Sequence, residues 1–240
     1  FDIVIVDEAH LIPPKGFGMY QQLLAGLREI NPKLRMVGLT ATPFRTDTGS
    51  LDAGDDRLFH GIAYECDLPQ MIEDGWLSPI TNLGTEAEID TSSVRTRAGE
   101  YRSDELEAAA IAGDLVERSV DELVKRSKGR KSWLIFACGI KHAEMISEEL
   151  GRHGIINACV FGSTHRDDRD DYIESFKRGD ITAMVNVGVL TTGFDAPQID
   201  LIALMRPTQS GGLYVQMVGR GLRIAEGKKD CLVLDFGTNV

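Results

Sequence analysis

Residues 1–10 read FDIVIVDEAH, an apolar and largely β-branched run that is followed at once by two carboxylates and a histidine. A short continuous apolar run is typical of a strand that is buried on both faces, as in a parallel sheet. Runs of the same type recur at Phe1–Val6, Met36–Leu39, Ile62–Cys66, Trp133–Ala137, Ala158–Phe161, Ala183–Val187, Leu201–Met205 and Cys231–Asp235.

Helical patterns lie between many of these runs. They cover Met19–Ile30, Lys141–Leu150 with Gly151 as C-cap, and Arg166–Arg178 with Gly179 in the same role. Because strands and helices alternate, we expect an α/β fold with parallel sheets.

One polar stretch, Leu83 to Arg102, interrupts the alternation. Ser103 then resembles an N-cap, followed by acidic residues and an apolar pattern that predicts a helix through to Lys128. We therefore expect a first α/β unit at 1–80, a connector at 81–102 and a second unit at 103–240, with the boundary near Ser78–Gly84.

The composition favours a globular chain that is neither a membrane protein nor a wholly basic module. Of 240 residues, 42% are hydrophobic and 26% charged, with a net charge of -11. No apolar run approaches the roughly 20 residues of a membrane span. The four cysteines lack zinc-ligand or redox spacing, which favours a reducing cytoplasm. A local basic groove on the acidic body stays open.

Asp7 and Glu8 directly follow the first predicted strand, at the sheet edge where α/β proteins bind ligands. In nucleotide hydrolysis, one such carboxylate holds magnesium through water and the next takes the proton of an attacking water. The alternative is an exposed acidic turn that caps the next helix. Thr40 and Thr42 end the second strand, where their hydroxyls can bond the carboxylates or His10; a proline-terminated loop is the alternative there.

Two further motifs are VGVLTTGFDAP at 187–197 and QMVGRGLR at 216–223. Arg220 and Arg223 are three residues apart, so on a helix both guanidinium groups would project from one face and could bind the same phosphate oxygens. An ordinary solvated face is the alternative interpretation.

The order of DEAH, TATPFR, WLIFACGIKHAE, VLTTGFDAP and QMVGRGLR resembles motifs II to VI of superfamily-two helicases, over essentially the whole chain. In its details, such as GLTATPFR, LMRP and YVQMVGRGLR, it most resembles the RadD branch of bacterial DNA-repair ATPases, with phage helicases and restriction-type translocases as close competitors. The resemblance implies two RecA-like lobes of the P-loop NTPase type, the first incomplete, that use ATP and magnesium to move on nucleic acid.

The resemblance also implies roles for single residues. Asp7 would position magnesium through water, Glu8 would activate the attacking water, and His10 with Thr40 and Thr42 would couple nucleotide state to domain movement. The second lobe would supply the nucleotide-site residues Gln216, Arg220, Arg223, Gly193 and Asp195, and the nucleic-acid backbone contacts Thr191 and Thr192.

Gly162, Ser163 and Thr164 stand between a predicted strand and a predicted helix, where they would either bind a backbone phosphate or only cap the helix. Such contacts carry no sequence specificity, and the preference for DNA over RNA follows from the family likeness alone.

The chain departs from the family pattern in one respect, because it contains no GxxxxGK[ST] phosphate-binding loop. We interpret the sequence as a fragment that begins on the motif II strand. Two alternatives are a non-hydrolysing module that binds nucleic acid or protein, and the translocating subunit of a restriction system. The absence of a cysteine-rich C-terminal tail leaves the RadD branch open.

Overall fold

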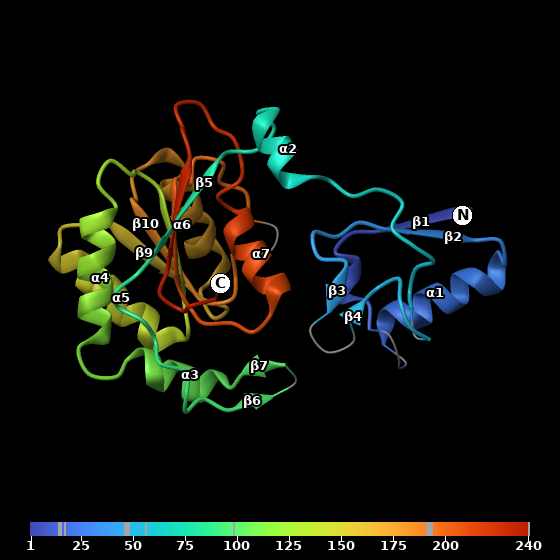
Figure 1. The fold of residues 1–240 in the computed structure, drawn as a ribbon, viewed down its shortest axis with the longest axis horizontal. Helices are drawn as coiled ribbons and strands as arrows, with labels where there is room; N and C mark the ends of the chain where they lie inside the picture. Colours follow the sequence, from blue (N-terminus) through green and yellow to red (C-terminus); the bar gives the residue numbers. More distant parts are fainter. Residues whose placement is uncertain are drawn as a thin grey trace. The chain divides into compact units, whose positions relative to one another are not determined.

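The computed structural model describes residues 1–13, 16, 18–45, 49–55, 57–97, 99–190 and 194–239, which form an α/β fold with parallel sheets (Figure 1). Two compact units are present. Unit 1 comprises Phe1–Cys66 with Ser210–Val215, and unit 2 comprises Asp67–Gln209 with Gln216–Val240. The sequence placed the boundary between the units near Ser78–Gly84, whereas unit 1 ends its first segment at Cys66.

Unit 1 contains a pair of parallel strands, β1 (Ile3–Val6) and β2 (Arg35–Gly38), connected through α1 (Met19–Ile30). A one-turn 3-10 helix, η1 (Ala9–Leu11), follows β1, and a small hairpin of β3 (Phe44–Arg45) and β4 (Gly49–Ser50) follows β2. The side chains of β1 and β2 alternate between half-buried and exposed. The predicted burial of these strands on both faces is therefore wrong for unit 1.

The predicted strand at Ile62–Cys66 is also wrong, because this segment is irregular and exposed. An apolar run becomes a strand only where a neighbouring strand supplies hydrogen-bond partners, and none of the described strands pairs with this segment.

Unit 2 is built on a six-stranded, entirely parallel sheet with the order β5-β12-β11-β8-β10-β9. The strands are β5 (Ile80–Gly84), β8 (Trp133–Ala137), β9 (Asn157–Val160), β10 (Ala183–Asn186), β11 (Leu201–Met205) and β12 (Cys231–Asp235). All residues of β8, β10, β11 and β12 are buried, as the continuous apolar runs predict. The apolar stripes of two helices, including Val120, Leu123, Ile146 and Leu150, complete one core with this sheet.

The helices of unit 2 follow the predicted alternation, with corrections at their ends. They are α2 (Leu68–Glu73), α3 (Ser103–Ala110), α4 (Leu115–Arg126), α5 (Ile140–Arg152) and α6 (Arg166–Arg178). The residues of α7 (Gly211–Gly219) are divided between the units, with those up to Val215 in unit 1 and the rest in unit 2. Gly179 ends α6 in the left-handed conformation, at φ 83°, as predicted. Gly151 does not end α5, since the helix continues to Arg152 and its C-cap is His153.

The helix predicted from Ser103 to Lys128 is two helices, because the chain turns between Ile111 and Asp114, where Gly113 adopts φ +59°. Ser103 is the first helical residue and not the N-cap, a position that Arg102 occupies without a side-chain hydrogen bond.

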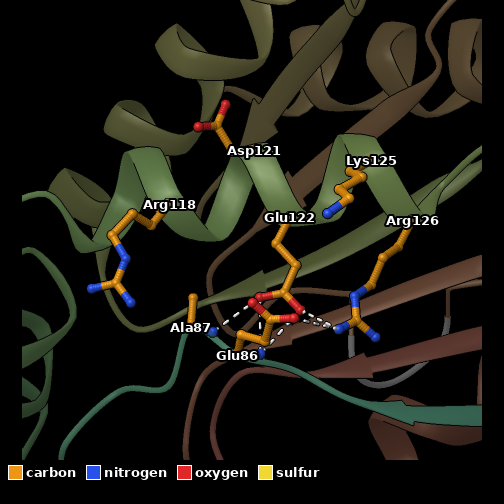
Figure 2. A pocket seen from close by; sticks show the side chains of 7 residues that line it. All are labelled: Glu86, Ala87, Arg118, Asp121, Glu122, Lys125 and Arg126. Carbon is orange, nitrogen blue, oxygen red and sulfur yellow. Dashed lines mark hydrogen bonds and ion pairs between the residues drawn. The ribbon is translucent and has the colours of Figure 1, made fainter.

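The predicted connector, 81–102, contributes directly to unit 2. Its first residues belong to β5, which pairs with β12 from Ile80 opposite Cys231 to Gly84 opposite Asp235. Next to β5, the carboxylate of Glu122 on α4 accepts the backbone N–H groups of Glu86 and Ala87 at 2.9 to 3.0 Å (Figure 2). Further along, β6 (Thr96–Arg97) and β7 (Glu100–Tyr101) pair as antiparallel strands. A strand partner and a carboxylate clamp, which the polar composition does not reveal, thus order this segment.

None of the helices within the described residues is long and apolar enough to cross a membrane.

A buried histidine makes the stability of unit 2 dependent on pH. His142 on α5 is 2% exposed, and burial lowers the pKa of its imidazole from 6.5 to about 4. Its Nδ1 accepts the backbone N–H of Cys138 at 3.3 Å, which fits a neutral ring. Between pH 6.5 and about 4 the unfolded chain binds a proton that the folded chain does not, so stability rises with pH across this window.

We expect this histidine to contribute stability that is fully present above pH 6.5 and is lost as the pH falls to about 4. At about 1.4 kcal/mol per pKa unit, the loss is about 2 kcal/mol by pH ~5 and about 3 kcal/mol in full. Urea unfolding at several pH values checks this against His142→Asn, which keeps an acceptor but does not titrate. Parallel pH profiles of the two proteins would contradict the prediction.

Candidate active site

The acidic pair lies directly after β1, at the C-terminal end of the strand. The backbone N–H of Glu8 donates to Oδ1 of Asp7 at 2.9 Å, which fixes the orientation of that carboxylate. Glu8 itself adopts φ 49° and ψ 47°, in the left-handed region, and precedes η1 as its N-cap. This conformation costs a residue with a side chain about 1–2 kcal/mol. Strained positions of this kind cluster at functional sites, where the surrounding structure holds them in place.

The surroundings that hold this loop come from the end of β2. The backbone N–H of Ala9 donates to the carbonyl of Leu39 at 3.0 Å, and Ala9 is fully buried. A Cβ added to Gly38 would lie 2.8 Å from Cβ of Ala9 and 2.3 Å from Cζ of Phe59. Gly38 therefore allows the acidic loop to pack closely against β2.

A chain of polar contacts joins the acidic loop to the TAT segment. Nδ1 of His10 lies 2.9 Å from Oγ1 of Thr40 and 3.3 Å from Oε2 of Glu8. The Thr40 hydroxyl donates to the carbonyl of Thr42 and accepts the N–H of Thr42, both at 3.0 Å. Because that hydroxyl has a single proton, Nδ1 of His10 is the donor in the contact with Thr40. The predicted contact between His10 and a threonine is therefore present, whereas the coupling role stays a prediction.

The side chain of Thr42 is turned away from solvent, with 1% of the residue exposed. Its link to this chain is made by its backbone N–H and carbonyl and not by its hydroxyl.

The acidic loop fits a magnesium ion that is held mostly by water and phosphate. No group of three or more histidine, cysteine or acidic side chains that could enclose a metal occurs in the part of the chain that the structure describes. Asp7 is exposed and presents a carboxylate at the strand end. Magnesium usually keeps several waters and takes one or two carboxylates together with substrate phosphates, so this donor set suits it.

Arg220 and Arg223 of unit 2 share a hydrogen-bond acceptor, but they do not lie on one helix face as predicted. Helix α7 ends at Gly219, so Arg220 and Arg223 lie in the non-helical segment that follows it and not on one helical face. Their Nη1 atoms nevertheless donate to the same acceptor, the carbonyl of Phe194, at 2.7 and 2.9 Å. Arg223 also pairs with Asp195 at 2.5 Å. The motif at 216–223 thus contacts the motif at 187–197 within unit 2, through the carbonyl of Phe194. The sequence pattern does not predict a role for this carbonyl.

The backbone between the two arginines packs closely against neighbouring side chains at Gly221. A Cβ added to Gly221 would lie 2.5 Å from Sγ of Cys231 and 3.0 Å from Cδ1 of Ile202. The segment between the two arginines therefore rests directly on β11 and β12, which permits only glycine at this position.

Some of the remaining predicted site residues lie outside the described residues, and others differ from the prediction. Gln216 lies on α7, and Thr191, Thr192 and Gly193 lie outside the described residues. Neither Ser163 nor Thr164 caps α6, because the N-cap is His165, whose side chain accepts the N–H of Asp167. Oγ1 of Thr164 instead accepts the N–H of Phe161 at 2.8 Å.

Sequence reasoning missed two side chains that organise these loops. Arg169 donates to the carbonyls of Phe161, Gly162 and Thr164 at 3.0 to 3.3 Å. Lys228 makes three similar contacts beside the arginine pair. Neither residue belongs to a motif, and their neighbours in sequence give no signal for these contacts.

Residues 115–225 match the family described as "Helicase conserved C-terminal domain". This part of the chain is therefore similar to helicase C-terminal domains. It begins at the first residue of α4 and extends just beyond Arg223, so it includes the segments of both converging motifs.

Some similar proteins align with nearly the whole chain, unit 1 included. The chain is 30% identical over 98% of its length to "Putative ATP-dependent helicase IRC3" of Saccharomyces cerevisiae, covering 34% of that protein. It is 25% identical over 98% of its length to a type I restriction enzyme EcoAI endonuclease subunit of Escherichia coli, covering 31% of that protein. The chain thus spans about a third of the length of these relatives.

A solved structure matches the fold over 98% of this chain. It is the ATP-dependent type ISP restriction-modification enzyme LlaBIII bound to DNA, with a TM-score of 0.64, 17% identity and coverage of 18% of that chain. The parallel sheets of this chain match RecA-like helicase lobes, as the sequence predicts.

Proposed function

We propose that this chain is part of the motor of an ATP-dependent DNA helicase or translocase. The observation that carries the proposal is the chain of contacts from Glu8 through His10 to Thr40, which joins two helicase-like motifs in one site. The similarity of residues 115–225 to helicase C-terminal domains supports it, and the arginine pair in that region suits a phosphate-binding role.

In the proposed reaction, ATP and magnesium supply the reactive phosphate and neutralise part of its charge. The carboxylate of Glu8 accepts a proton from water, whose oxygen forms a bond to the γ-phosphorus as the bond to the leaving ADP oxygen breaks. Asp7 would hold magnesium through water. Arg220 and Arg223 would stabilise negative charge that develops on the transferred phosphoryl group.

Other residues keep the supporting roles that the family resemblance implies. We propose that His10, Thr40 and Thr42 transmit the nucleotide state, and that Gln216, Gly193 and Asp195 contribute to the nucleotide site. Thr191 and Thr192, with Gly162, Ser163 and Thr164, are the proposed contacts to the nucleic-acid backbone. The finer proposals are the RadD-like branch, a role in DNA repair or recombination and a cytoplasmic location, all of which rest on the sequence motifs and composition.

ATP turnover by the full-length protein tests the function. We expect turnover to rise at least about tenfold when DNA is added, and to rise less with RNA of the same length and sequence. Stronger stimulation by RNA would overturn the DNA assignment. Tight DNA binding without any ATP hydrolysis would favour a non-hydrolysing binding module instead.

The likeness to the EcoAI subunit favours a second candidate, the translocating subunit of a restriction system. This protein would use the same ATP site but act beside a nuclease. Cleavage of DNA by the full-length protein in an ATP-dependent manner would support this candidate, and translocation without cleavage would support the first.

A further inference from the structure

The ammonium group of Lys228 is bonded to three backbone carbonyls. Its Nζ donates to Arg223 at 2.7 Å, to Gly221 at 2.8 Å and to Pro197 at 3.2 Å. A lysine ammonium has three N–H donors, and these contacts use all of them. The Lys228 side chain therefore links three points of the backbone to one another through hydrogen bonds.

These points belong to the two motifs that form the arginine site. Gly221 lies between the paired arginines and Arg223 is the second of them, while Pro197 ends the segment that carries Phe194 and Asp195. The carbonyl between them, of Leu222, accepts the backbone N–H of Ser78 at 2.6 Å. Three successive carbonyls of the arginine segment are therefore held, two of them by Lys228.

Within hydrogen-bond distance, the groups that the Lys228 ammonium contacts among the described residues are neutral backbone carbonyls. No ion pair joins Lys228 to a carboxylate among the residues that the structure describes, although Asp200 and Asp230 act on it from farther away. Burial lowers the pKa of the lysine, which reflects the cost of holding the charge in a half-buried place. The neighbouring Lys229 is exposed and makes none of these contacts, so it offers a matched control.

We propose that Lys228 is a positioning residue for Arg220 and Arg223, which fixes their backbone against Pro197 so that both guanidinium groups are oriented for ATP hydrolysis. The inference rests on the proposed function of the arginines. Lys228 does not contact the nucleotide in this role. It acts by preorganisation, in which a displacement of about 1 Å can cost about 100-fold in rate.

Steady-state ATP turnover of the full-length protein tests this role in four forms: the wild type, Lys228→Met, Lys228→Arg and Lys229→Met. We expect Lys228→Met to lower kcat about 10- to 100-fold while KM for ATP changes less than about threefold. Lys228→Arg should recover part of the loss because it keeps the charge and several donors. Lys229→Met should match the wild type. If Lys228→Met does not fold, Lys228→Gln replaces it, and failure of both to fold would overturn the proposal in favour of a purely structural role.

A double-mutant cycle separates positioning from a general loss of stability. In an Arg220→Ala and Arg223→Ala background, Lys228→Met should lower the remaining turnover less than about twofold, because the groups it positions are gone. A full additional loss in that background, or wild-type turnover of Lys228→Met alone, would overturn the inference. If Arg220→Ala itself leaves turnover unchanged, the proposed function of the arginines fails instead.

Discussion

Replacing Glu8 with glutamine in the full-length protein is expected to lower nucleic-acid-stimulated ATP turnover by about 100- to 10,000-fold. Glutamine has nearly the same shape as glutamate, but its amide cannot accept the proton of the attacking water. Oε2 of Glu8 is shielded from solvent beside His10, while a third of the side chain stays exposed. One oxygen is therefore buried beside His10 without a hydrogen-bond partner among the described residues, and the exposed part of the carboxylate remains accessible to a substrate water.

The loss should occur in chemistry and not in folding or binding. Glu8 takes part in the backbone turn through its own N–H and carbonyl, which glutamine retains. Single-turnover kinetics and ATP binding by the variant, together with its unfolding midpoint, separate these effects. Glu29→Gln, at an exposed position of α1, is the matched control for loss of one negative charge. Turnover by Glu8→Gln within about threefold of the control would remove Glu8 as the general base.

Elements that are buried on every side were predicted best from the sequence. The bounds of β8, β11 and β12 agree with the predicted runs, because a central parallel strand must be apolar along its whole length. Helices α1 and α6 also agree with the predicted bounds, and α6 has a glycine where the chain leaves the helix.

Elements that depend on distant partners were predicted poorly. The polar composition of residues 81–84 hides an edge strand, because the hydrogen bonds that make it a strand come from β12, some 150 residues later. The run at Ile62–Cys66 has the right composition, but none of the described strands pairs with it. Local pattern therefore shows which segments can become strands, and pairing decides which of them do.

In the candidate site, the sequence identifies residue types suited to the chemistry but only part of their geometry. The motifs identify Asp7, Glu8, Arg220 and Arg223 as residues suited to phosphate chemistry, and the contact of His10 with Thr40 follows from their places at adjacent strand ends. The convergence of the arginines could not be predicted correctly. The glycines at 219 and 221 disfavour helix, so the chain leaves α7 before the first arginine and brings the pair together through a turn.

Arg220→Ala in the full-length protein is expected to lower kcat for ATP by about a thousandfold or more, the magnitude typical of arginines that stabilise phosphoryl transfer. The fold should tolerate the change. The Phe194 carbonyl that Arg220 contacts keeps its second donor, Nη1 of Arg223 at 2.9 Å, so no buried acceptor loses its last partner. We therefore expect a loss of about 1 kcal/mol or less in the free energy of unfolding.

Two comparisons show whether the guanidinium acts on the transition state. Arg220→Lys should recover little activity, because an ammonium keeps the charge but cannot bind two phosphate oxygens in a planar fork. Arg166→Ala removes an exposed arginine of α6 and should leave turnover unchanged. An arginine that acts mainly in the transition state lowers kcat much more than it weakens ATP binding. Equal losses in ATP affinity and in kcat/KM with an unchanged kcat would instead show that Arg220 only helps to bind the ground state, and the role proposed for it in hydrolysis would then be wrong.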